Sequence, residues 1–353
     1  MVDLTAEDKA YMRRCLQLAR CGRGTTSPNP MVGAVIVHEG RIIGEGYHIR
    51  AGEPHAEVNA VNSVKECDKA LLAEATVYVT LEPCSHYGKT PPCCDMLISK
   101  GVKRVVVGVP DDNAAVNGAG ISRMRAAGIE VVVGVCEEEC YRINRAFFTY
   151  HKFSRPSVTL KWAQSADGFI DVVREGGSPL AISTPLSRVA VHKLRSTHDA
   201  ILVGTRTALL DNPTLNVREW CGRNPLRLVI DRRGVLPLAL NLFDGTLPTI
   251  VYTEKIIAGK FGKNIEQIEV DFSGDVLHSI LSHLYSIKVN SLLVEGGASL
   301  LQAFIDASLW DNIRIEVNPR LFVGNGVAAP VLPKGLPVEE TGCDGNVILN
   351  LHC

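Results

Sequence analysis

The chain has 353 residues, of which 46% are hydrophobic and 21% charged, and its net charge at pH 7 is −1. Such a composition is typical of a soluble globular protein with two domains of ordinary size. Proteins that grip a nucleic acid backbone usually carry a clear basic excess, so the near-neutral charge favours a small-molecule substrate over RNA or DNA. No apolar run approaches the roughly 20 residues of a membrane span, and the acidic first residues predict that there is no signal peptide.

The eleven cysteines are odd in number and irregularly placed. In a long sequence for which no signal peptide is predicted, we interpret them as reduced thiols, including a metal-binding pair, and not as a disulfide framework. We therefore expect a cytoplasmic protein that binds neither nucleic acid nor membranes.

Helices alternate with apolar strands in the first part of the chain, which indicates an α/β layered domain. The predicted helices are 5–20, 54–67, one that starts at 91–92 and ends before Gly101, and 122–127. The predicted strands are 31–37, 41–47, 76–80, 102–109 and 129–135. The first two strands flank a short turn and form a predicted hairpin.

A second α/β pattern begins after a polar and aromatic stretch at 147–156. Its predicted strands are 157–163, 200–203, 226–230, 249–252 and 291–294. We place the boundary near residue 152, which gives two domains, 1–152 and 153–353.

The most informative pattern is His-Ala-Glu at 55–57, followed by Cys84 and Cys93. One imidazole and two thiolates can hold Zn²⁺ with a fourth position open for water. Glu57 lies two residues after His55, so it can reach that water without binding the metal. Hydrolytic deamination of an amidine-like ring carbon needs an activated water and a carboxylate that carries its proton to the departing amine. The usual second half of the pattern, P-C-x-x-C, is stretched here to Cys93.

Cys94 is an alternative to Cys93, because adjacent helix residues point about 100° apart and only one can face a metal. A simpler interpretation makes His55 a capping residue and the cysteines small core residues. The combined motif at helix starts, where partial positive charge favours thiolates, supports the zinc interpretation instead. A nucleic-acid-binding module with a structural zinc is a further alternative, which the neutral charge opposes.

Three segments, 27–37, 55–57 and 80–93, closely resemble the family of bifunctional riboflavin biosynthesis deaminase-reductases. The resemblance covers nearly the whole chain. It implies a cytidine-deaminase-like three-layer α/β/α domain followed by a dihydrofolate-reductase-like α/β domain. The implied substrate is 2,5-diamino-6-(5-phosphoribosylamino)pyrimidin-4-one. Deamination and NADPH-dependent reduction of its ribosyl group would give 5-amino-6-(5-phosphoribitylamino)uracil.

The same resemblance implies the roles of the deaminase residues. His55, Cys84 and Cys93 bind Zn²⁺ and Glu57 carries the proton. The residues implied to hold pyrimidine, ribose and phosphate are Asn29, His48, His86, Lys89, Thr90 and Asn113. A surface position for His48 and a capping role for Thr90 are the alternatives. The family usually has Asp-Pro-Asn-Pro where this chain has Asp-Asp-Asn-Ala at 111–114.

In the second domain the resemblance rests on the segments 160–168, 191–195, 199–207, 211–218 and 294–297. The residues implied to line the substrate are Lys161, Arg195, Leu215, Arg218 and Glu295. The residues implied to contact NADPH are Ala163, Ala181, Thr207, Asp211, Arg232, Gly296 and Gly297. The glycine pair follows a buried strand and opens a helix, where backbone amides can approach a diphosphate. No G-x-G-x-x-G is present, so this is not the usual dinucleotide fingerprint.

Arg232 follows another predicted strand and is our candidate for the 2′-phosphate of NADPH, with a solvated arginine as the alternative. One departure concerns Ala181, which stands where many family members have a tryptophan near the cofactor. A deaminase whose second domain is a non-reducing scaffold is therefore the alternative function. We also expect a homo-oligomer.

Overall fold

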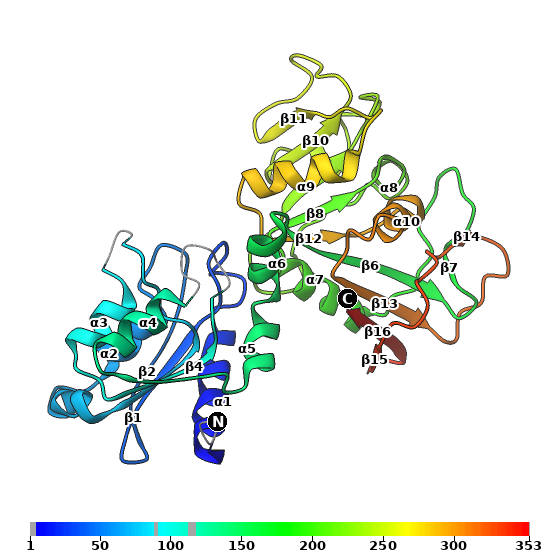
Figure 1. Cartoon of the computed structure of the whole chain (residues 1–353). Helices are drawn as coiled ribbons and strands as arrows, with labels where there is room; N and C mark the ends of the chain where they lie inside the picture. Colours follow the sequence, from blue (N-terminus) through cyan, green and yellow to red (C-terminus); the bar gives the residue numbers. More distant parts are fainter. Residues whose placement is uncertain (1–4, 88–90, 112–117, 353) are drawn as a thin grey trace. The chain divides into compact units, whose positions relative to one another are not determined.

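The computed structural model describes residues 5–87, 91–111 and 118–352. The chain divides into two compact units, Met1–Ser154 and Arg155–Cys353 (Figure 1). Each unit has its own hydrophobic core. The boundary expected at residue 152 falls within helix α6, just before this division. Among the described residues, no helix combines the length and the hydropathy that crossing a membrane requires.

The first unit is built on a five-stranded sheet with the order β2-β1-β3-β4-β5. β1 is antiparallel to both of its neighbours, whereas β3, β4 and β5 run parallel. The strands are β1 (Gly33–His38), β2 (Arg41–Tyr47), β3 (Thr76–Leu81), β4 (Arg104–Val109) and β5 (Glu130–Val133). The carboxyl end of β3 therefore lies in the middle of the sheet, where it leads directly to Cys84.

Helices cover both faces of this sheet, which confirms the expected three-layer arrangement. α1 packs with α5 on one face, and α2, α3 and α4 pack on the other (Figure 1). The helices are α1 (Ala6–Arg20), α2 (Ala56–Ser63), the 3₁₀ helix η1 (Glu66–Glu74), α3 (Cys93–Ser99), α4 (Ala119–Ala126), α5 (Glu137–Ile143) and α6 (Arg145–Phe153). Thr5 accepts a hydrogen bond from the Asp8 N–H and so caps α1 as its sequence predicts.

One local prediction in this unit was wrong. The helix expected over 54–67 ends at Ser63, because Val64 takes an extended conformation and is buried in the core. The polar and aromatic stretch at 147–156 contributes to α6, whose buried Phe147 and Phe148 face the core.

The second unit contains, within its described residues, a nine-stranded sheet with the order β11-β10-β9-β8-β12-β6-β13-β16-β15. Neighbours from β11 to β13 are parallel, and the last two pairs are antiparallel. The strands are β6 (Ser157–Ser165), β8 (Ala200–Val203), β9 (Leu226–Ile230), β10 (Thr249–Thr253), β11 (Ile265–Glu269), β12 (Ser291–Val294), β13 (Asn312–Asn318), β15 (Val338–Cys343) and β16 (Asn346–His352). A separate pair joins β7 (Phe169–Asp171) to β14 (Val327–Ala328).

Two apolar clusters cover the two faces of the large sheet. One contains side chains of α9 (Val276–Ser286) and α10 (Ala298–Asp306), and the other contains side chains of α7 (Pro185–Ser196) and α8 (Thr205–Asp211). The short 3₁₀ helix η2 (Asn241–Phe243) closes the second cluster. Sequence analysis found only the most apolar strands, because β15 is almost wholly exposed and β13 carries charged side chains among its apolar ones.

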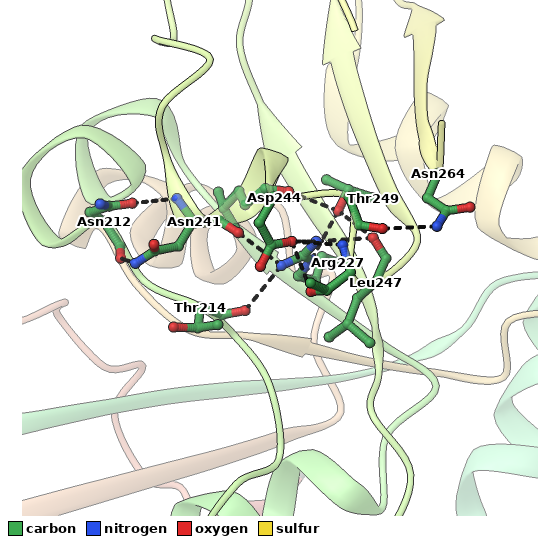
Figure 2. Close-up of polar contacts among 11 residues, drawn as sticks. Asn212, Thr214, Arg227, Asn241, Asp244, Leu247, Thr249 and Asn264 are labelled. Atoms are coloured by element: carbon green, nitrogen blue, oxygen red, sulfur yellow. Dashed lines mark hydrogen bonds and ion pairs between the residues drawn. The ribbon is translucent and has the colours of Figure 1, made fainter. Parts of the chain in front are cut away.

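A fully buried arginine holds the loops at the amino end of β9 and β10 (Figure 2). Arg227 Nε donates to Thr249 Oγ1 at 2.9 Å, and Nη2 donates to Asp244 Oδ1 and to the Leu247 carbonyl, both at 2.9 Å. Nη1 donates to the carbonyls of Asn241 at 3.0 Å and Thr214 at 3.5 Å. All five guanidinium N–H groups thus have acceptors, which a charge without access to water requires.

We expect Arg227→Met to lower the free energy of unfolding by about 3 kcal/mol, because removal of one partner from a buried pair leaves the others unsatisfied. Urea denaturation measures this effect. Arg232→Met is the control, since Arg232 forms its ion pair with Glu254 at the exposed surface and should change stability little. Equal losses in the two variants would contradict the structural importance of the Arg227 network.

A candidate zinc centre and a candidate cofactor cavity

Three side chains from separate elements meet in the first unit and can hold a metal. His55 immediately precedes α2, Cys84 follows β3, and Cys93 is the first residue of α3. Their ligand atoms lie within 4.8 Å of one another. His55 Nδ1 is 3.6 Å from Cys84 Sγ and 3.4 Å from Cys93 Sγ.

These distances fit zinc. With Zn–S near 2.3 Å and Zn–N near 2.0–2.1 Å, a tetrahedral angle separates sulfur and nitrogen by roughly 3.5 Å. Cys94 is fully buried in the apolar core, and its Sγ contacts Asp95 Oδ1 at 3.6 Å. Of the two adjacent cysteines, Cys93 is therefore the one whose sulfur joins the cluster.

The thiol pKa values of Cys84 and Cys93 are shifted in opposite directions. The Cys93 side chain, with lesser contributions from His55 and the Cys93 backbone N–H, lowers the pKa of Cys84 to about 4. The same contact and burial raise the pKa of Cys93. A cation at this position would hold both sulfurs as thiolates, because a coordinating thiol is deprotonated.

Glu57 lies in the first turn of α2 and is 3% exposed. Burial, and then the nearby Cys84 thiolate, raise the pKa of Glu57 to about 7. A bound cation acts in the opposite direction, since positive charge favours the carboxylate. Glu57 thus lies beside the cluster as a carboxyl group that can both take up and release a proton.

Asn29 and His48 lie together beside this cluster. Asn29 Nδ2 is 3.1 Å from His48 Nε2, and His48 Nδ1 is 3.2 Å from the Pro54 carbonyl. The His48 ring is buried and meets the His55 ring edge-on at 5.4 Å between centroids. His48 is therefore not a surface residue. His86 is exposed, and Lys89, Thr90 and Asn113 lie outside the described residues.

Sequence analysis missed Glu82, a buried carboxylate two residues before Cys84. Its Oε2 accepts the N–H groups of Asp111 at 3.2 Å and Gly118 at 3.1 Å, and its Oε1 accepts those of Gly120 at 3.0 Å and Ile121 at 3.2 Å. Four backbone donors on one acceptor-only group fix the start of α4 to the end of β3.

The second unit contains a cavity of about 1190 Å³ at the carboxyl ends of β6, β8, β9 and β12. Open parallel sheets usually bind ligands at this edge. The cavity is lined by many of the residues expected there, namely Lys161, Ala163, Ala181, Thr207, Asp211, Glu295, Gly296 and Gly297.

The glycine pair leaves room for a ligand against the backbone. Gly296 has φ +127° and Gly297 has φ +75°, conformations that other residues rarely adopt. A Cβ at Gly296 would lie 3.0 Å from Thr207 Cγ2, and one at Gly297 would lie 3.3 Å from Thr207 Oγ1. The bare backbone before α10 is thus the kind of surface that approaches a diphosphate.

Four of the expected reductase residues do not line this cavity, and each has another environment. Arg195 donates two hydrogen bonds to Glu295, at 3.0 and 2.7 Å. Leu215 is buried in the core, with φ +51°. Arg218 is exposed and donates to Asn216 Oδ1 at 3.2 Å. Arg232 is exposed and paired with Glu254, with hydrogen bonds of 3.2 and 2.8 Å.

Lys161 and Glu295 give the cavity a charged floor. Burial lowers the pKa of Lys161, and Glu295 partly opposes this shift. Burial alone would raise the pKa of Glu295, but Arg195 and then Lys161 outweigh burial and lower it. Glu295 is therefore an anion held between two cations.

Three arginines that line the cavity, Arg174, Arg188 and Arg206, were not predicted from the sequence. Arg188 is exposed, lies near the start of α7 and forms no ion pair with any described residue. Arg206 is exposed, lies in the first turn of α8 and forms no ion pair with any described residue. The Arg174 side chain is only 7% exposed and forms ion pairs with Asp171 and Asp211. Arg174 also depends on a distant segment, because its second partner, Asp211, belongs to α8.

Comparison with known proteins identifies both units. The cytidine and deoxycytidylate deaminase zinc-binding region matches residues 5–109, and the RibD C-terminal domain matches residues 156–351. The chain is 42% identical to riboflavin biosynthesis protein RibD of Aquifex aeolicus, over 91% of this chain and 89% of that protein. It is 36% identical to RibD of Escherichia coli, over 93% of this chain and 92% of that protein.

Solved structures agree over the same length. A Thermotoga maritima diaminohydroxyphosphoribosylaminopyrimidine deaminase/5-amino-6-(5-phosphoribosylamino)uracil reductase superposes with a TM-score of 0.89 at 38% identity, covering 98% of both chains. RibD of Acinetobacter baumannii superposes with a TM-score of 0.88 at 33% identity, again covering 98% of both chains. Since the similarity covers both units in the same order, the chain belongs to the RibD family of bifunctional riboflavin biosynthesis enzymes, in which a zinc-binding deaminase domain precedes a reductase domain.

Proposed function

We propose that the first unit deaminates 2,5-diamino-6-(5-phosphoribosylamino)pyrimidin-4-one and that the second reduces the ribosyl group of the product with NADPH. The product would be 5-amino-6-(5-phosphoribitylamino)uracil. The observation that carries the proposal is the meeting of His55, Cys84 and Cys93 beside the buried carboxyl group of Glu57. The substrate named for the Thermotoga maritima relative supports the same choice of pyrimidine.

In the deaminase reaction, His55, Cys84 and Cys93 would hold zinc, which supplies the Lewis acidity that makes water nucleophilic at neutral pH. Glu57 accepts a proton from the attacking water as its oxygen bonds to the ring carbon. Glu57 then donates that proton to the amino group as the carbon–nitrogen bond breaks and ammonia leaves. Asn29 lies beside the cluster and would orient the ring through its amide.

In the reductase reaction, the cavity of the second unit would bind the nicotinamide cofactor that this type of domain implies. Gly296 and Gly297 would receive the diphosphate, and Thr207 and Asp211 would contact the cofactor near it. Lys161 and Glu295 would face the phosphoribosyl substrate from the cavity floor. The alternative function, a deaminase with a non-reducing second unit, is tested by giving the deaminated intermediate and NADPH to the protein and measuring NADPH oxidation.

NADPH differs from NADH by a 2′-phosphate, which a positively charged side chain must bind if the protein is to select NADPH. We propose that Arg206 recognises this phosphate, because Arg206 lines the cavity next to Thr207 and has no ion-pair partner among the described residues. Arg188, the other cavity arginine without such a pair, is the alternative. Arg232, the residue expected from the sequence, lies away from the cavity lining, and Glu254 already neutralises its charge. Homo-oligomerisation also stays a prediction, and light scattering of the purified protein tests it.

Cys84→Ser and Cys93→Ser should each lose most of the bound zinc, because a Cys₂His set with one thiolate removed has only two strong ligands left. Metal analysis of the purified variants measures this loss. Cys94→Ser is the matched control and should keep one zinc per chain. Full zinc in Cys93→Ser together with loss in Cys94→Ser would show that the ligand assignment is wrong.

Glu57→Gln should keep its zinc but lose deamination by roughly 10²–10⁴-fold or more, since an amide preserves the shape and cannot transfer the proton. Ammonia release from the diamino substrate measures the effect. Reduction of already deaminated substrate by the same variant is the internal control and should match wild type. Near-normal ammonia release would remove Glu57 from the mechanism.

Arg206→Ala should raise the dissociation constant of NADPH about 10-fold, which corresponds to about 1.4 kcal/mol, and should change NADH binding little. Fluorescence titration of each nucleotide measures binding without turnover. Arg232→Ala should leave both nucleotides near their wild-type affinities. If Arg232→Ala selectively lost affinity for NADPH and Arg206→Ala kept wild-type affinity, Arg232 would be the residue that binds the 2′-phosphate, as expected from the sequence.

A further inference from the structure

Arg174 joins three segments at the wall of the reductase cavity. Its Nε donates to Asp171 Oδ2 at 2.7 Å, and its Nη2 donates to Asp211 Oδ1. Its Nη1 donates to the carbonyls of Gly177 and Leu210, both at 3.1 Å. The Arg174 guanidinium group thus links the end of β7 and the following loop to the last turn of α8.

The loop between β7 and α7, residues 172–183, forms one wall of the cavity through residues 172–174 and 178–183. Its carboxyl end is held to the large sheet, because Ser183 Oγ donates to Glu316 Oε2 at 2.7 Å and Asn318 Nδ2 donates to the Ile182 carbonyl at 3.1 Å. Its amino half is held at Asp171, whose Oδ1 accepts the N–H groups of Val172 at 2.9 Å and Leu180 at 3.1 Å.

Arg174 adds the cation that links the amino half of this wall to α8, through Asp171 and Asp211. Asp171 and Asp211 would repel each other without it, because both carboxylates line the cavity and Arg174 bridges them. The wall also presents apolar side chains to the cavity, among them Val173, Pro179 and Leu180. Hydrogen bonds that hold this wall come from its polar anchors, among them Asp171, Arg174 and Ser183.

We propose that Arg174 is a positioning residue of the reductase: it holds Asp211 and the wall 172–183 in the arrangement that admits the cofactor. This inference rests on the proposed NADPH-dependent reduction. A protein whose binding-competent arrangement is only partly populated binds its ligand more weakly in proportion to that population. Loss of Arg174 should therefore weaken cofactor binding, while a saturated enzyme should still react.

The test compares Arg174→Met with Arg155→Met in the full-length protein. Arg155 is a matched control, since its guanidinium donates two hydrogen bonds to Asp311, at 2.7 and 3.0 Å, and it does not line the cavity. Fluorescence titration gives the dissociation constant of NADPH, and steady-state kinetics give KM and kcat on deaminated substrate. Hydrogen exchange of the peptide 172–183 reports on the wall directly. Zinc content and deamination check that the first unit is intact.

Arg174→Met should raise the dissociation constant and KM for NADPH about 10-fold or more, with kcat within about 3-fold of wild type, and should speed exchange in 172–183. Arg155→Met should leave NADPH binding and that exchange unchanged even where it lowers the melting temperature. Arg174→Lys, which keeps the charge but loses the guanidinium group, should fall between wild type and Arg174→Met.

Two results would overturn the inference while leaving the proposed function intact. One is wild-type NADPH affinity in Arg174→Met, and the other is an equal loss of affinity in Arg155→Met. If wild-type protein bound no NADPH, the proposed cofactor would be wrong and the inference would fall with it.

Discussion

The structure of both units depends on charged side chains that are buried away from water. A buried charged side chain is stable only where several hydrogen-bond partners surround it. Arg227 fixes the loops beside β9 and β10 because five acceptors surround it. Glu82 fixes the start of α4 because four backbone donors surround it. Satisfying each group forces distant segments into one geometry. The segment that Glu82 fixes leads directly to Cys84 of the metal cluster.

The same rule distinguishes the two sites chemically. In the first unit the site consists of two thiols and an imidazole. Their ligand atoms lie close together and suit a small cation. In the second unit the ionic groups already neutralise one another in Arg195–Glu295 and Arg174–Asp211 pairs. Lys161, Arg188 and Arg206 are left to meet a ligand that brings its own negative charge, such as a phosphate.

The zinc-binding motif was predictable because its parts are short, local and placed at element ends. The succession of strands along the first unit and the most apolar strands in the second also followed from periodicity. The choice between Cys93 and Cys94 depends on the rotation of α3, which the sequence does not reveal. Arg232 and Arg206 both follow buried strands, and their difference lies in Glu254, whose place beside Arg232 arises from the pairing of β9 with β10. The role of Arg174 could not be predicted from the sequence for a similar reason, since its partner Asp211 belongs to another element.

Separate cores have a consequence for how the protein melts. The apolar clusters of the first unit share no member with those of the second, so we expect each unit to have a cooperative unfolding transition of its own. Each unit also has its own stabilising ligand, and a ligand that binds only the folded form raises the stability of the unit it binds. A chelator and a nucleotide should therefore act on different transitions of the same calorimetric trace. The order in which the two activities are lost on heating is then set by the supply of metal and cofactor, and a single melting temperature does not describe this enzyme.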